Sequence, residues 1–253
     1  MKAGRRASPE ELRPHPGPTP ADGEVMRVAG SRSGALRAAI FGVNDGLVSN
    51  LSLIMGVAGG GLGPEGIVLA GVAGLLAGAF SMGAGEYVSM RVQREIFERL
   101  IHLEAHELGT DPEGEREELT HLLQKRGIPS DAAETAARAM MADPKQALDV
   151  HAREELGLDP KELGSPWGAA TSSFATFAAG AFVPLIPYLF TGGVAAAWTS
   201  VGFALGTLFV VGALLAVFTG RSWVFAGARQ LLIGGAAATV TFLVGRALGV
   251  AVA

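Results

Sequence analysis

Apolar residues run through this chain in five long stretches, separated by short polar turns or by one long charged segment. Each stretch reaches the length of about 20 residues that a helix needs to cross the hydrocarbon core of a bilayer. Two prolines, Pro184 and Pro187, predict a kink in the third stretch. The pattern predicts an all-α membrane protein with five transmembrane helices, over residues 38–61, 67–90, 169–189, 194–219 and 224–250.

A strongly charged segment separates the second stretch from the third. Residues 91–162 contain 17 acidic and 10 basic side chains, whereas residues 163–220 contain none. This contrast predicts a water-soluble insert between two membrane-embedded parts. The chain therefore divides into a proline-rich, disordered cytosolic arm, the first two spans, a helical metal-binding insert and the last three spans, over residues 1–33, 35–90, 91–165 and 166–253.

Helix-start signals divide the insert. The second span continues as a helix to about residue 108, and Asp111-Pro112 starts the next helix with an N-cap and a proline at its first position. Another helix opens at Ser130, and Asp143-Pro144 either starts a separate last helix or bends that one. We therefore expect a three-helix insert between spans two and three.

Lysine and arginine collect at one set of span ends, and cytoplasmic loops are the ones that are rich in these residues. Arg37 precedes the first span, Arg91 follows the second, and Arg221 lies in the turn between the fourth and fifth. The opposite turns, at residues 63–66 and 190–193, contain neither lysine nor arginine. The arm and the insert are therefore predicted in the cytosol and the C-terminus on the far side of the membrane.

Composition removes several classes of function. The 253 residues include 24 acidic, 20 basic and no cysteine residues, which excludes disulfides, thiolate metal sites and cysteine nucleophiles. A net charge of −4 gives no reason to expect a nucleic-acid partner. The sequence has no dinucleotide fingerprint, phosphate-binding loop or nucleophile elbow, which argues against an enzyme and against a prosthetic cofactor.

Three side chains inside the first two spans are candidates for an ion path. Asp45 lies within the first span, and Glu86 lies near the cytosolic end of the second, four residues after Met82 on the same helix face. A carboxylate at this depth is costly unless it is paired, hydrated or metal-bound. Asp45 and Met82 offer a hard oxygen and a soft sulfur, which suit a borderline transition-metal ion better than Mg²⁺ or Ca²⁺. The alternative is a structural hydrogen bond between helices, to Asn44, Ser49, Ser52 or Ser81.

The insert carries a second set of candidate ligands. Glu104 and Glu107 share one helix face, and Glu115 and Glu118 repeat that spacing on the next helix. Like-charged neighbours destabilise a helix, an effect that a bound cation reverses. The remaining candidates on the insert are Glu154, Glu155, His102, His106, His121 and His151. The alternative is an ordinary solvated acidic face.

Small residues recur every four positions in the first two spans. They are Gly42 and Gly46 in the first span, and Ala70, Gly74 and Gly78 in the second. Such stripes let helices approach closely, and they mark contacts between helices of one chain or of a dimer.

Two long membrane motifs carry a family resemblance. Residues 41–50 read FGVNDGLVSN, and residues 81–89 read SMGAGEYVS. Both resemble the vacuolar iron transporter family, and residues 151–157, HAREELG, resemble the family's bacterial members. The resemblance covers about residues 35–250, with the same five-span order and an insert after the second span.

This resemblance implies a transporter that exports Fe²⁺, and also Mn²⁺ or other divalent transition metals, from the cytosol in exchange for protons. It implies a homodimer in the lipid bilayer, whose second-span helices extend into a cytosolic metal-binding domain. It further implies that Asp45, Met82 and Glu86 line the transport path. By position, the implied metal ligands of the insert are Glu104, Glu107, Glu115, Glu118 and Glu155.

One position departs from the plant-type members of that family. They place two methionines in the last insert helix, where this chain has His151 and Ala152. We therefore expect His151 to serve as a nitrogen ligand instead. Abundant alanine, glycine and arginine with few lysines favour a bacterium of high GC content, for which the membrane would be the plasma membrane.

Three other functions stay open at this point. A membrane-anchored iron sensor or store would bind iron in the insert without moving it. A passive channel would move the ion without proton coupling, and a membrane enzyme would need catalytic motifs that the sequence lacks. A sensor or store would lose all function with the insert, whereas a transporter would keep some flux.

Overall fold

The computed structural model describes residues 33–161 and 163–252, which form helices, turns and loops with no strand among them. The predicted disordered arm lies outside these residues, apart from its last residue. The elements in chain order are α2 (Ser33–Gly59), α3 (Pro64–Thr110), α4 (Pro112–Lys125), α5 (Ser130–Met140), α6 (Pro144–Glu154), α7 (Pro166–Phe182), the 3₁₀ helix η1 (Val183–Leu189), α8 (Gly193–Thr219) and α9 (Trp223–Val252).

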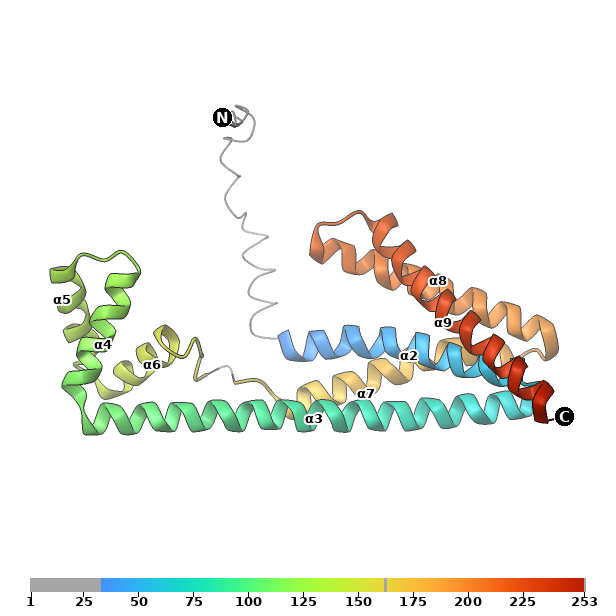
Figure 1. The fold of residues 1–253 in the computed structure, drawn as a ribbon, viewed down its shortest axis with the longest axis horizontal. Helices are drawn as coiled ribbons and strands as arrows, with labels where there is room; N and C mark the ends of the chain where they lie inside the picture. The colour runs from blue at the N-terminus through green and yellow to red at the C-terminus, as the bar shows by residue number, and fades with distance from the viewer. Residues whose placement is uncertain (1–32, 162, 253) are drawn as a thin grey trace, which may run out of the picture.

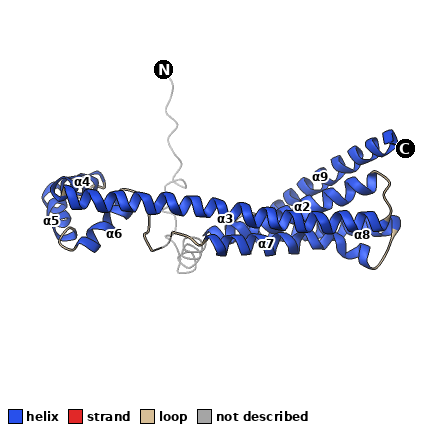
Figure 2. Ribbon diagram, turned by 90° about the horizontal axis from the view of Figure 1, so that it is seen from below, coloured by secondary structure: helices blue, strands red, loops and turns tan. Residues whose placement is uncertain are grey.

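Five segments of the structure are long and apolar enough to cross a membrane, in the same number and order as the five predicted spans. They are α2, the first part of α3, α7 together with η1, α8 and α9. These segments gather at one end of the molecule, and α4, α5 and α6 lie at the other end (Figures 1 and 2). The side of the membrane on which the second group lies stays a prediction.

Helix α3 joins the two parts and runs along both of them (Figure 1). Its 47 residues extend for about 70 Å at the usual rise per residue. Beyond its apolar part, ion pairs one turn apart support the helix, Arg91 with Glu95 at 2.8 Å and Arg94 with Glu98 at 2.7 Å. One continuous helix therefore connects the insert to the apolar bundle.

The third span changes its helix type midway. Helix α7 ends at Phe182, and the chain continues as η1 through Pro184 and Pro187. Proline has no N–H to donate to an α-helical hydrogen bond, so the chain tightens into a 3₁₀ helix here. The two prolines that predict a kink thus lie where the third span leaves α-helical geometry. Ser200 of α8 donates a hydrogen bond to the carbonyl oxygen of Pro184 at 2.6 Å, which satisfies a polar atom inside the bundle.

Glycines set the close spacing of helices around α2. A Cβ atom at Gly46 would collide with the backbone of Phe177 in α7. On α3, a Cβ atom at Gly74 would collide with Leu53 of α2, and one at Gly78 would collide with the ring of Phe177. The predicted small-residue stripes are therefore confirmed as contacts between helices of one chain.

The insert has its own small apolar core. Leu119 and Leu123 of α4 pack against Ala133 and Ala137 of α5, and all four side chains are buried. Helix α6 packs against α3 and contacts α4 and α5 as well. The extension of α3 therefore forms one wall of the insert.

Two predicted helix starts in the insert are confirmed. Asp111 accepts a hydrogen bond from the N–H of Gly114 at 3.0 Å, and Asp143 accepts one from the N–H of Lys145 at 2.8 Å. A proline occupies the first helical position after each cap. Because a turn at residues 141–143 separates α5 from α6, the alternative of one bent helix is wrong.

Candidate metal sites

Four polar side chains converge inside the insert, and we call them the insert cluster. Each offers one ligand atom, and all these atoms lie within 4.8 Å of one another; the residues are Glu104, Glu115, His151 and Glu155. The Nδ1 atom of His151 lies 3.0 Å from Oε1 of Glu104 and 3.5 Å from Oε2 of Glu115. It lies 3.8 Å from Oε2 of Glu155. The cluster thus combines one nitrogen with three carboxylates.

Helix packing turns these ligands inward. Glu104 lies on the extension of α3, Glu115 at the start of α4 and His151 near the end of α6. Glu115 stands one turn before Leu119, and His151 stands one turn after Ala147, and both of these apolar residues are buried. The helix faces that form the insert core therefore also carry the ligands.

The centre of the insert cluster is withdrawn from water. The side chains of His151 and Glu104 are 0% and 3% exposed. Neither ring nitrogen of His151, nor Oε1 of Glu104, has a hydrogen-bond partner among the residues that the structure describes. Buried polar atoms are normally hydrogen-bonded or bound to an ion. The unprotonated ring nitrogen of His151 and Oε1 of Glu104 can therefore each offer a lone pair to a metal ion.

Burial also sets the protonation of the insert cluster. It raises the pKa of Glu104 to about 7, and the charges of Glu155 and Glu115 add to this effect. Burial likewise raises the pKa of Glu115 and of Glu155, and it lowers the pKa of His151. A divalent cation can replace the proton that Glu104 retains near neutral pH. Nitrogen and oxygen donors together suit a borderline transition-metal ion.

The other predicted insert residues lie outside this cluster. Glu107 and Glu118 are exposed, although their charges raise the pKa of Glu155 and so act on the cluster from its rim. Oε2 of Glu154 lies 2.6 Å from the guanidinium of Arg126 and forms an ion pair with it. Of the six predicted metal ligands of the insert, the structure therefore brings four together and leaves Glu107 and Glu118 outside; Glu154 and the other three histidines, the further candidates, are not in the cluster.

A second site lies between the apolar helices. Asp45 of α2 and Met82 of α3 line one cavity of about 240 Å³, which we call the bundle cavity. Ser49 donates a hydrogen bond to Oδ1 of Asp45 at 2.7 Å; both residues lie on α2, so this bond lies within one helix and is not the bond between helices that the alternative expected. The remaining lining residues are Asn50, Leu53, Gly74, Gly78, Ser81 and Phe177. An oxygen ligand and a sulfur ligand thus border the same space.

Glu86 is placed differently. Its carboxylate lies 3.3 Å from the guanidinium of Arg37, and the two side chains are 17% and 70% exposed. Among the described residues, it is not one of those that line the bundle cavity. The structure therefore brings Asp45 and Met82 together and places Glu86 in an ion pair between α2 and α3.

Asn50 also lines the bundle cavity, although the sequence pattern did not point to it. It is 2% exposed and donates a hydrogen bond from Nδ2 to the carbonyl oxygen of Ala181 at 2.6 Å. A polar side chain inside an apolar span was the available signal. Asn50 follows Asp45 by five positions, so the three- and four-residue spacing of one helix face does not link them.

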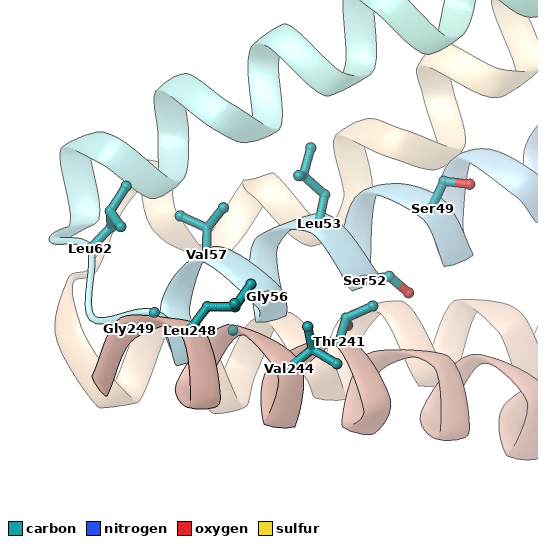
Figure 3. Close-up of a pocket in the computed structure, with 12 residues that line it drawn as sticks. Ser49, Ser52, Leu53, Gly56, Val57, Leu62, Thr241, Val244, Leu248 and Gly249 are labelled. Carbon is teal, nitrogen blue, oxygen red and sulfur yellow. The ribbon is translucent and has the colours of Figure 1, made fainter. Parts of the chain in front are cut away.

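A groove between α2 and α9 adjoins the bundle cavity. Its volume is about 900 Å³, and it shares Ser49 and Leu53 with the cavity. Figure 3 shows Ser49 and Ser52 toward one end of the groove and Leu62 and Leu248 toward the other. The hydroxyl-bearing end of the groove therefore meets the cavity, and the rest of the groove is apolar.

Known proteins are similar to this chain over both sites. The sequence model of the VIT family matches residues 36–246. A vacuolar iron transporter of Acanthamoeba castellanii is 35% identical over 218 residues, 84% of this chain and 75% of that protein. Vacuolar iron transporter 1 of Arabidopsis thaliana is 30% identical over 208 residues, 82% of this chain and 83% of that protein. Vacuolar iron transporter homolog 5 of Oryza sativa subsp. japonica is 32% identical over 249 residues, 96% of this chain and 93% of that protein.

Proposed function

Because this chain belongs to the VIT family, we propose that it exports Fe²⁺ from the cytosol through its apolar bundle, in exchange for protons. The similar proteins are named iron transporters rather than enzymes, which supports metal transport. The direction, the proton exchange and Mn²⁺ as a second substrate are parts of the proposal. The observation that carries it is that a carboxylate and a thioether, from Asp45 and Met82, line one cavity inside the bundle.

In the first step, the insert collects the ion from the cytosol. The insert cluster holds Fe²⁺ through His151 and three carboxylates, and the exposed Glu107 and Glu118 attract the ion to it. Binding displaces the proton that Glu104 retains near neutral pH. The insert thus raises the local concentration of the metal beside the membrane.

In the second step, the ion passes into the bundle cavity. The carboxylate of Asp45 supplies the single negative charge among the described residues of the cavity, and Met82 supplies a soft sulfur ligand. Protonation of Asp45 from the far side removes that charge, so the metal leaves as the proton binds; protonation of Glu86 would act from outside the cavity, by releasing Arg37. Competition between one proton and one metal ion for a carboxylate is the simplest basis for exchange.

The setting of this transport is also part of the proposal. We place the chain in a bacterial plasma membrane as a homodimer, with its N-terminus and insert in the cytosol and its C-terminus on the far side. The relatives' names refer to vacuoles, where export from the cytosol would have the same direction. Lysine and arginine at the cytosolic span ends support this orientation.

Reconstitution into proteoliposomes tests the proposal. Anaerobic Fe²⁺ uptake by inside-out vesicles should depend on an acidic lumen, and the lumen should lose protons as the metal enters. The variant Asp45→Ala should fall to the background rate, since it removes the only carboxylate that lines the bundle cavity among the described residues. Glu65→Gln, an exposed carboxylate at the start of α3, is the matched control and should keep the wild-type rate.

Two results would contradict the proposal. A wild-type rate in Asp45→Ala would remove the bundle cavity from the path, and a rate that ignores the pH gradient would point to a passive channel. Replacing Fe²⁺ by Mn²⁺, Co²⁺, Ni²⁺ or Zn²⁺ in the same assay ranks the substrates, because affinity alone favours the later metals of this series.

A membrane-anchored iron store is the second candidate, and the insert cluster is the observation that favours it. A store would hold iron in the cluster without passing it on. The double variant Glu104→Gln/His151→Ala separates the two functions. A transporter keeps part of its flux without the cluster, whereas a store shows no flux in the wild type and no iron binding in the double variant.

A further inference from the structure

The amide of Asn50 is fixed in one orientation. Its nitrogen donates to the carbonyl oxygen of Ala181 at 2.6 Å, and a carbonyl can only accept a hydrogen bond. The amide oxygen must therefore point to the other side of the planar group. The side chain is 2% exposed, so neither atom can exchange its partner for bulk water.

The amide oxygen of Asn50 has no hydrogen-bond partner among the described residues. It faces α3 at Gly74, where an added Cβ atom would lie 3.1 Å from it. Asn50 and Gly74 both line the bundle cavity, together with Asp45 and Met82. A buried oxygen with free lone pairs therefore borders the space that holds the two predicted ligands.

We propose that Oδ1 of Asn50 is a third ligand for the metal ion in the bundle cavity. This inference rests on the proposed function, because it assigns a residue to the same transport site. An amide oxygen is a hard ligand without charge, so it adds to coordination while Asp45 remains the only anion among the described residues that line the cavity. Protonation of that one carboxylate then suffices to release the ion.

A structural role for Asn50 makes a different prediction from a ligand role. As a structural residue, Asn50 would act only through its N–H group, which ties α2 to Ala181 of α7. As a ligand, it acts through its oxygen. Asn50→Leu removes both groups, whereas Asn50→Asp keeps an oxygen and loses the donor. The two variants therefore separate the roles.

The experiment measures equilibrium binding of radioactive Fe²⁺ to the full chain in detergent without oxygen. All proteins carry Glu104→Gln and His151→Ala, so that the insert cluster does not contribute. Asn50→Leu should bind Fe²⁺ at least about tenfold more weakly, and Asn50→Asp should bind it at least as tightly as the parent, because a carboxylate oxygen is a stronger ligand than an amide oxygen. Ser200→Ala is the matched control, because it loses a buried hydrogen bond of equal length, to Pro184, outside the cavity.

Equal losses in Asn50→Leu and Asn50→Asp would overturn the proposal, because only the donor is missing from both. Parent-like binding in Asn50→Leu would also overturn it. If Asn50→Leu does not fold, Asn50→Cys decides: a thiol ligand raises the affinity for Cd²⁺ relative to Mn²⁺, and an unchanged ratio rules out the ligand role. Absent flux in wild-type proteoliposomes would contradict the proposed function and leave this binding result standing.

Discussion

The Nδ1 atom of His151 lies 3.0 Å from Oε1 of Glu104, and both side chains are almost fully buried. Burial lowers the pKa of the imidazole and raises that of the carboxyl to about 7, so both groups favour their uncharged forms. A divalent ion between them can use the neutral imidazole as it is, but it needs the carboxyl group of Glu104 to be ionised. Metal binding in the insert is therefore linked to the release of a proton.

The affinity of the insert cluster for Fe²⁺ should rise with pH and level off above about pH 7, the pKa of Glu104. At pH 6 this carboxyl is mostly protonated, so the metal must displace a proton; at pH 8 it need not. Calorimetric titration of the Asp45→Asn variant, in two buffers of different ionisation enthalpy, measures the protons released. A pH-independent affinity would contradict the predicted linkage.

Replacing His151 by alanine should weaken Fe²⁺ binding to the insert by at least about tenfold, because it removes the one nitrogen ligand of the cluster. His102→Ala is the matched control, since His102 is exposed on the same helix as Glu104 and lies outside the cluster. Binding is measured in the Asp45→Asn background. Equal affinities of the two variants would show that His151 is only a core residue.

Glu104→Gln should stabilise the metal-free insert and weaken its metal binding. The folded pKa of about 7 exceeds the ordinary value of 4.5, so the folded insert retains a proton that the unfolded chain has lost. Its stability therefore falls as pH rises from 4.5 to about 7, by about 3 kcal/mol. Glutamine removes this dependence, so the variant should gain stability at pH 8 and almost none at pH 4.5.

Hydrogen exchange of helices α4 to α6 measures this effect. Tryptophan fluorescence would not report on the insert, because the three tryptophans are Trp167, Trp198 and Trp223. Slower exchange of these helices in Glu104→Gln at pH 8 is the expected result. Equal exchange in the two proteins at every pH would contradict the raised pKa of Glu104.

The spans and the helix caps were predictable because their signals are local. An apolar run of sufficient length, or Asp143 followed by proline, acts through neighbouring residues alone. The insert cluster was predictable only in part. Equal spacing relates Glu104 to Glu107, but the packing of α4 and α6 on α3 decides that Glu104 is buried and Glu107 exposed. The role of Asn50 was not predictable for a similar reason: its amide orientation depends on a contact with α7, the hydrogen bond to the carbonyl oxygen of Ala181.

Gly46→Ala should destabilise the apolar bundle by about 1–3 kcal/mol, because the added methyl group collides with the backbone of α7. Gly206→Ala is the matched control in α8, where a Cβ atom meets nothing within 4 Å among the described residues. That variant should be unchanged or more stable, since alanine favours helices. Thermal unfolding followed by tryptophan fluorescence compares them, and equal midpoints would contradict the packing argument.

The last prediction concerns the ion pair of Arg37 and Glu86, whose charged groups lie 3.3 Å apart. Glu86→Gln leaves the exposed guanidinium of Arg37 without its counter-charge, and this positive charge repels an approaching divalent ion. Arg37→Gln frees the carboxylate to attract the ion. The double variant removes both charges, so its transport rate should lie above that of Glu86→Gln and below that of Arg37→Gln.

Initial Fe²⁺ uptake rates at low and high salt test this electrostatic coupling. The differences between the variants should shrink at high ionic strength, because salt screens exposed charges. Arg138→Gln is the control, since it breaks an exposed ion pair with Glu134 on α5 and should not change uptake. A double variant no faster than Glu86→Gln would contradict this coupling. In that case Glu86 acts as a ligand of the ion, and the charge of Arg37 does not govern access to the path.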